Sequence, residues 1–221
     1  MKGLLLKEWY QNVWALALLF LLILPRDGNL FEPACMIALI IGIYPLWSIA
    51  ADQRSRFDRY QLTLPIAKEK RWDVYYVLLA VMTAVLLLLF YLLHGRDLPN
   101  YDMLKHMTSD AEFEIYSKFH SLMTVRQYLC AQIVCTLLPA ACYIPAAAKG
   151  GRSMGLCIAL LPYIVIVLVC SVLSRAYVQE SLFGMKIYES ELLFEIAAGA
   201  ALVLFLLSRM LSVRALRRAE S

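Results

Sequence analysis

Charged and aromatic side chains gather between Asp52 and Arg71, and their spacing suits docking onto a partner. Phe57, Tyr60 and Leu64 recur at intervals of three and four residues, which places them on one face of a short helix. The other side of that helix is charged and carries Arg56, Asp58 and Arg59. Such a helix can fill an apolar groove on another protein, with ion pairs at its sides. The alternative is a basic connector that lies on anionic lipid.

The predicted helix has a defined end. Leu64 precedes Pro65, and a residue before proline is biased out of the helical region, so the helix should end there. Thr63 can cap a second short helix that has Pro65 in its first turn. This second helix is expected over 66–72 and leads into the next apolar run.

Two apolar runs position this segment, Pro33–Ala51 before it and Val74–Leu93 after it. Each is about long enough to cross the roughly 30 Å hydrocarbon core of a membrane as a helix. The segment between them is therefore a polar loop outside the hydrocarbon. Because six of its residues are Lys or Arg, the loop is expected on the cytoplasmic side.

The order of these residues resembles the ABC-2 type permease family of bacterial ABC transporters. The matching positions are Asp52, Phe57-Asp58, Leu64-Pro65-Ile66, Ala67, Lys68 and Glu69, and the opening residues 1–8 are also similar to that family's start. Ala67 stands where the family usually has Ser. The resemblance covers the whole chain in layout and about thirty residues in motif.

This resemblance implies that the loop 52–71 is a coupling element that docks on a separate ATPase subunit. The residues it implies for this coupling are Asp52, Phe57, Asp58, Arg59, Tyr60, Leu64 and Pro65. It also implies a second permease copy or a related permease as partner. In its small size and lack of a soluble domain, the chain is similar to permeases that export amphipathic or antimicrobial peptides, such as phenol-soluble modulins. Lipids or drugs are the alternative cargo.

Composition places the chain in a membrane. Apolar residues make up 62% of it and charged residues 17%, against about 25% charged residues in soluble domains. The 221 residues are expected to form a single transmembrane permease domain, 1–221, in the bacterial cell membrane with lipids around it.

The expected fold class is an all-α membrane protein with six transmembrane helices and both termini cytoplasmic. The predicted elements are an interfacial helix at 1–12, spans at about 9–24, 33–51, 74–93, 127–148, 153–174 and 192–208, and an outer loop at 94–126. With this topology about fourteen of the 21 Lys and Arg residues lie inside and about eleven of the 17 acidic residues lie outside.

Two carboxylates stand near the outer end of the last predicted span. Glu191 and Glu195 are four residues apart and so share one helical face. An ionisable group in a span is a candidate for function, here in the translocation path or an outer gate. The alternative is a pair of hydrated carboxylates at the membrane interface.

The usual catalytic and cofactor motifs are missing from the sequence. It contains no G-x-x-x-x-G-K-[ST], no H-E-x-x-H and no G-x-S-x-G, so this chain is not expected to be an enzyme or to bind a cofactor. ATP and Mg²⁺ would be bound by the partner ATPase, and no nucleic acid is expected. A non-transporting membrane scaffold or sensor is the alternative of a different class.

Neither histidine nor cysteine residues form a recognisable metal motif. His106 and His120 are fourteen residues apart without a Cys partner, so no metal site is predicted. The six cysteines all lie in predicted spans, at positions 35, 130, 135, 142, 157 and 170. They are expected to behave as small apolar residues and to form no disulfide framework.

Overall fold

The computed structural model describes residues 31–54, 68–95, 123–173 and 187–218, and these are helical apart from a few residues at segment ends. Its elements in chain order are α2 (Phe31–Arg54), α4 (Lys68–His94), α7 (Val125–Leu173), the short 3-10 helix η1 (Ile187–Ser190) and α9 (Glu191–Arg218). No strand occurs in the described ranges. The predicted all-α class is confirmed for this part of the chain.

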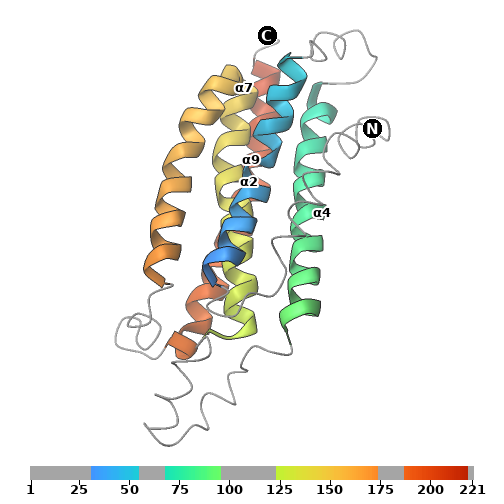
Figure 1. The fold of residues 1–221 in the computed structure, drawn as a ribbon. Helices are drawn as coiled ribbons and strands as arrows, with labels where there is room; N and C mark the ends of the chain where they lie inside the picture. The colour runs from blue at the N-terminus through green and yellow to red at the C-terminus, as the bar shows by residue number, and fades with distance from the viewer. Residues whose placement is uncertain (1–30, 55–67, 96–122, 174–186, 219–221) are drawn as a thin grey trace, which may run out of the picture.

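Helix α7 folds back on itself and supplies two antiparallel arms (Figure 1). Its first arm, Val125–Gly150, and its second arm, Ser153–Val172, are each long and apolar enough to cross a membrane. The chain reverses around residues 149–152, between the spans predicted at 127–148 and 153–174. The helical assignment continues around the bend, so the reversal needs no separate loop.

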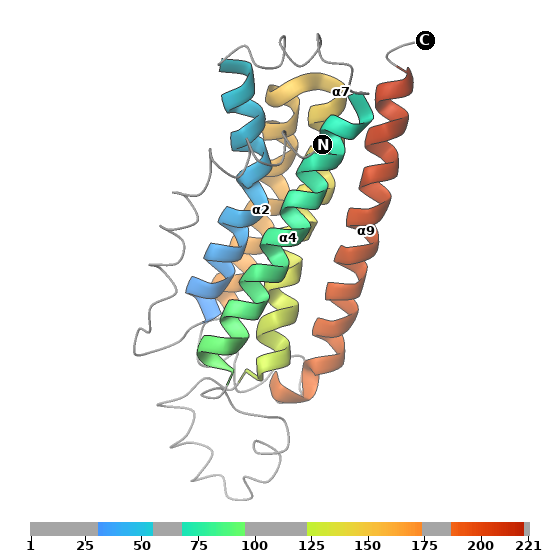
Figure 2. The same ribbon diagram turned by 90° about the vertical axis from the view of Figure 1, so that its right-hand side faces the viewer.

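The helices run side by side along one long axis (Figures 1 and 2). At one end lie the last turn of α2, the first turn of α4, the bend of α7 and the last turn of α9; we call this the loop end, because residues 55–67 leave from it. The opposite end, called the junction end, holds the start of α2, the end of α4 and the start of α9. This up-and-down order is the one that the predicted spans require.

Burial shows which helices face outward. Of the most apolar stretch of each segment, 56% is buried in the first arm of α7, against 22% in the second arm and 28% in α9. The exposed faces of α4, the second arm and α9 are rich in Leu, Ile and Val. Four helical segments of the described chain are suited to crossing a membrane, and α2 adds a shorter apolar stretch, Ala34–Ile49. The protein is thus a multi-pass membrane protein whose first α7 arm lies at the centre of the bundle.

Close packing of α2 on α7 forms the middle of the core. A side-chain Cβ added at Gly42 would lie 2.7 Å from the backbone oxygen of Thr136, so only glycine allows this approach. The Tyr143 hydroxyl, from the same arm, donates a 2.6 Å hydrogen bond to the Gly42 carbonyl. That carbonyl lies in the turn before Pro45, where proline disturbs the helical hydrogen bonds. The Tyr143 hydrogen bond therefore fastens α2 to α7 in the turn before the proline.

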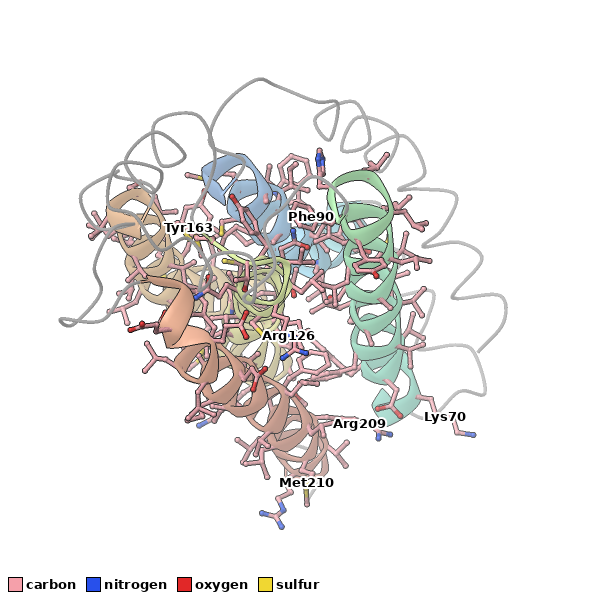
Figure 3. The ribbon with its side chains drawn as sticks, turned by 90° about the horizontal axis from the view of Figure 1, so that it is seen from below. Lys70, Phe90, Arg126, Tyr163, Arg209 and Met210 are labelled. Carbon is pink, nitrogen blue, oxygen red and sulfur yellow. The ribbon has the colours of Figure 1, made fainter. Side chains whose placement is uncertain are left out.

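A capping box starts the first arm of α7. The Thr124 hydroxyl accepts a hydrogen bond from the Gln127 backbone N–H at 3.4 Å, and the Gln127 side-chain oxygen accepts one from the Thr124 N–H at 2.9 Å. One turn later, Tyr128 stacks on Phe90 of α4 with ring centroids 5.4 Å apart. Figure 3 shows Phe90 directed from α4 into the bundle. Together these contacts fix where α7 enters the bundle and how it faces α4.

The predicted spans at 33–51, 74–93, 127–148, 153–174 and 192–208 correspond to α2, α4, the two arms of α7 and α9. The largest difference is at the end of α9, which continues ten residues beyond the predicted limit, to Arg218. Its 28 residues extend about 42 Å, longer than the roughly 30 Å hydrocarbon core, so its polar end can pack on α4 beyond the apolar region.

The remaining predicted elements lie outside the described residues. These are the interfacial helix 1–12, the first span at 9–24, most of the coupling loop 52–71 and most of the outer loop 94–126. The number of six spans and the cytoplasmic side of the two termini therefore stay predictions.

Candidate functional site

The loop end is where the predicted coupling residues enter the described structure. Asp52, in the last turns of α2, is only 4% exposed. The Tyr75 hydroxyl of α4 donates a long hydrogen bond of 3.4 Å to its carboxylate. Tyr75 also meets Trp72 edge to face, with ring centroids 5.7 Å apart. Asp52 thus holds the end of α2 against α4, and its carboxylate faces into the bundle.

An ion pair joins the start of α4 to the end of α9. The Arg209 guanidinium donates to both carboxylate oxygens of Asp73, at 2.8 Å and 3.1 Å. This two-pronged geometry is the strong form of an arginine–carboxylate contact. In Figure 3 Arg209 reaches from α9 towards α4, at the same end as Lys70. Because the Arg209 side chain is 56% exposed, we assign the pair only about 1 kcal/mol.

Hydroxyl groups extend this contact towards the bundle interior. The Tyr76 hydroxyl lies 2.8 Å from the Ser212 hydroxyl and accepts a 3.2 Å hydrogen bond from Ser208. The Tyr76 ring packs on Phe205, one turn earlier on α9, with centroids 5.1 Å apart. All four side chains are buried. Hydrogen bonds among buried hydroxyls are directional, so α4 and α9 are held in one register here.

These contacts make the loop end a connected structure. Residues 55–67 join α2 to α4, and both helices are fastened within two turns of the points where that segment begins and ends. From α4 the Asp73–Arg209 pair and the Tyr76 hydroxyl cluster lead on to α9. A force applied to residues 55–67 would therefore act on three helices at once. The arrangement suits mechanical coupling between a bound partner and the bundle.

The other predicted coupling residues lie outside the described ones. They are Phe57, Asp58, Arg59, Tyr60, Leu64 and Pro65. Their shared helical face and their docking role stay predictions.

The junction end contains the second predicted site. Glu191, the first residue of α9, accepts a 2.5 Å hydrogen bond from the Thr124 hydroxyl, and its other oxygen lies 3.8 Å from the Arg126 guanidinium. Beside it, the Gln127 amide donates a 3.2 Å hydrogen bond to the Ser190 hydroxyl. Figure 3 shows Arg126 near the centre of this end of the bundle. Glu191 thus ties α9 to the capping box of α7.

Glu195 does not share this environment. It lies one turn further along α9 with an exposed side chain, whereas the Glu191 side chain is only 16% exposed. The two carboxylates predicted as a pair therefore have different surroundings. Glu191 is part of a helix junction, and Glu195 is free to face lipid headgroups or water.

Comparison with known proteins identifies the family to which this chain belongs. A family profile described as an ABC-2 family transporter protein matches residues 3–217, nearly the whole chain. The chain belongs to the ABC-2 transporter family. Searches of curated proteins and of solved structures gave no match.

Membership of the ABC-2 family gives the chain its general role. ABC-2 proteins are the membrane permease components of ABC transporters, and they act with an ABC ATPase subunit. The permease itself is generally not the catalytic component. The resemblance found from the loop 52–71 is thereby confirmed at the level of the family.

Several residues of this ABC-2 permease were not singled out from the sequence. Thr124-x-x-Gln127 is a recognisable capping-box pattern and was detectable. Ser208 and Ser212 form a polar pair at i, i+4 near the end of an apolar helix, which also indicates a helix contact. Asp73 and Arg209 carry no such local signal, because 136 residues separate them.

The ion pair at the loop end leads to a testable prediction. Replacing Arg209→Asp in the ABC-2 permease brings two carboxylates together and should lower the free energy of unfolding by roughly 1 kcal/mol. Exchanging the charges, Asp73→Arg with Arg209→Asp, should recover about half of that loss or more. Unfolding of the purified protein in mixed micelles measures all three variants. Arg214→Asp, on the same helix at an exposed position, is the matched control. Equal losses for Arg209→Asp and Arg214→Asp would contradict a role for the pair.

Proposed function

We propose that this chain is the permease subunit of an ATP-driven exporter in the bacterial cell membrane, where two copies, or one copy and a related permease, form the translocation unit. Each would bind an ABC ATPase subunit through the loop 52–71. ATP-driven closure of the ATPase dimer would push the two loops together and switch the unit from inward to outward access. The proposed cargo is an amphipathic or antimicrobial peptide, with lipid or drug as the alternative.

The observation that carries this proposal is the family match over residues 3–217, and the loop end supports it physically. The segment 55–67 leaves from α2 at Arg54 and returns to α4 at Lys68, and both helices are fastened to their neighbours close to these points. A partner that displaces the segment would therefore move α2, α4 and α9 together.

The junction end offers a place where outward access would be controlled. Opening that end by moving α9 away from α7 would break the Thr124–Glu191 and Gln127–Ser190 hydrogen bonds. Both are largely shielded from water, so breaking them costs about 1 kcal/mol or more each. Such contacts favour a closed outer end in the resting state, which ATP-driven movement would then overcome.

The choice of peptide cargo rests on resemblance alone. The layout of the chain is similar to that of exporters of amphipathic peptides. The outward-facing sides of α4, α9 and the second arm of α7 are apolar, which suits lipid contact and apolar cargo alike.

Co-purification tests the proposed partnership. The wild-type protein, extracted in mild detergent, should co-purify with the ABC ATPase encoded beside it. Phe57→Asp with Leu64→Asp should abolish this, because two charges would enter an apolar groove, with an expected loss of affinity of more than about a hundredfold. The matched control is Leu104→Asp with Phe113→Asp, which places the same substitutions in the predicted outer loop.

Two results would count against the proposal. Failure of the wild type to bind any ATPase would favour the membrane scaffold. Loss of binding in the outer-loop control, with the coupling-loop variant still bound, would place the docking surface at the opposite end.

A further inference from the structure

Three cysteines from three separate helical segments meet inside the bundle. Cys35 comes from α2, Cys135 from the first arm of α7 and Cys170 from its second arm. Their sulfur atoms all lie within 4.8 Å of one another, and the Cys135 and Cys170 sulfurs are 3.9 Å apart. All three residues are at most 3% exposed. The described cysteines are reduced thiols and form no disulfide.

The sulfur spacing matches that of a metal site. In a tetrahedral zinc site with Zn–S bonds of about 2.3 Å, two sulfur ligands lie about 3.8 Å apart. The Cys135–Cys170 separation already has this value, and small rotations of the Cys35 side chain would bring its sulfur to the same distance. Ordinary apolar packing does not require three thiols to converge on one point.

A polar side chain without a hydrogen-bond partner lies beside this cluster in sequence. Gln132 is fully buried, and neither its amide nitrogen nor its amide oxygen has a hydrogen-bond partner among the described residues. It precedes Cys135 by three residues and so shares its helical face. An unsatisfied buried amide costs about 1–3 kcal/mol, which suggests that Gln132 serves something besides packing. An oxygen donor would complete the four-coordinate geometry that zinc prefers.

We propose that Cys35, Cys135 and Cys170 bind a Zn²⁺ ion, with the Gln132 amide oxygen as the fourth donor. On binding, three S–H bonds break, three Zn–S bonds form and three protons leave to water. The site then carries one net negative charge. A monovalent soft ion such as Cu⁺ would leave two negative charges in the low-dielectric interior, which is costlier, so the divalent ion is favoured.

Such an ion would fasten α2 to both arms of α7. Ala159 and Ile166 of the second arm already pack in the common core, and Cys170 lies near the junction end, three residues before the last residue of α7. Bound zinc would therefore add a link at the junction end between the centre of the bundle and the second arm, where only 22% of the most apolar stretch is buried. Zinc would act here as a structural ion within the transport domain.

The test uses the full-length protein in detergent, purified with a reductant, stripped with a chelator and then titrated with Zn²⁺. Elemental analysis after removal of free metal should find about one zinc per wild-type chain. The single variants Cys35→Ala, Cys135→Ala and Cys170→Ala should each lose it. Cys142→Ala and Cys157→Ala are the matched controls, because these cysteines are exposed on α7, and both should retain it.

A second variant separates metal binding from simple packing. Gln132→Leu removes the unsatisfied amide, so without zinc it should unfold at a higher temperature than wild type. Its zinc affinity should fall roughly tenfold or more. A purely structural Gln132 would give the first effect without the second.

Two outcomes overturn the proposal. One is wild-type protein that folds, as judged by size-exclusion chromatography, and retains no zinc. The other is zinc that remains equally bound in Cys35→Ala, Cys135→Ala and Cys170→Ala, which would identify an adventitious ion. Neither outcome depends on an ATPase or on a cargo, so the metal site and the proposed transport function can fail independently.

Discussion

Replacing Gly42→Ala should destabilise the membrane bundle by about 2 kcal/mol. The added Cβ would lie 2.7 Å from the Thr136 oxygen and 3.0 Å from the Cys135 oxygen, where ordinary contacts begin near 3.4 Å. Both neighbours are backbone atoms of a packed helix, so α2 and α7 must separate by several tenths of an ångström. Overpacking of this kind costs about 1–3 kcal/mol. The shift would also weaken the Tyr143–Gly42 hydrogen bond, worth about 1 kcal/mol.

Gly199→Ala is the matched control for this substitution. Gly199 lies on α9 with nothing within 4 Å of an added Cβ, so the new methyl group meets open space. Removing a glycine from a helix interior gains up to about 1 kcal/mol in helix propensity. Unfolding in mixed micelles should therefore show a loss for Gly42→Ala and no loss for Gly199→Ala. Equal effects at both positions would mean that the close approach of α2 and α7 does not limit stability.

The fold was largely predictable because hydrocarbon thickness sets the length of each span. Runs of about twenty apolar residues, separated by charged segments, located α2, α4 and both arms of α7 to within a few residues at most boundaries. The end of α9 was not predictable in this way. Its last turns are held by Ser208, Arg209 and Ser212 on α4, and hydropathy carries no information about such long-range contacts.

The candidate site was predictable only in part, because a sequence pattern reveals local features and not long-range contacts. A helical face such as Phe57, Tyr60 and Leu64 is a local pattern, so the sequence alone indicates it. The cysteine cluster is not local: 100 residues separate Cys35 from Cys135, and their meeting depends on how α2 packs against α7. The same six cysteines, taken from the sequence, indicated only apolar residues in spans.

The double substitution Phe57→Ala with Leu64→Ala should uncouple ATP hydrolysis from transport. Both side chains belong to the apolar face proposed to fill a groove on the ATPase, and truncating such anchors costs about 2 kcal/mol or more each. The protein, reconstituted in vesicles with its ATPase, should transport a fluorescent amphipathic peptide at least about tenfold more slowly. Hydrolysis by the ATPase should fall much less. Leu104→Ala with Phe113→Ala, in the predicted outer loop, is the control.

The deciding quantity is the ratio of the peptide transport rate to the ATP hydrolysis rate, because a folding defect lowers both rates together. The loop segment 55–67 is attached to α2 and α4 near Asp52 and Asp73, and Asp73 is in turn paired with Arg209 of α9. Truncating Phe57 and Leu64 leaves these contacts intact, so the bundle should stay folded. Movement of the ATPase should then no longer be transmitted to the bundle. An unchanged ratio in the double variant would show that Phe57 and Leu64 do not transmit the force. The docking face would then have to be sought among the charged residues of the same loop, beginning with Asp58 and Arg59.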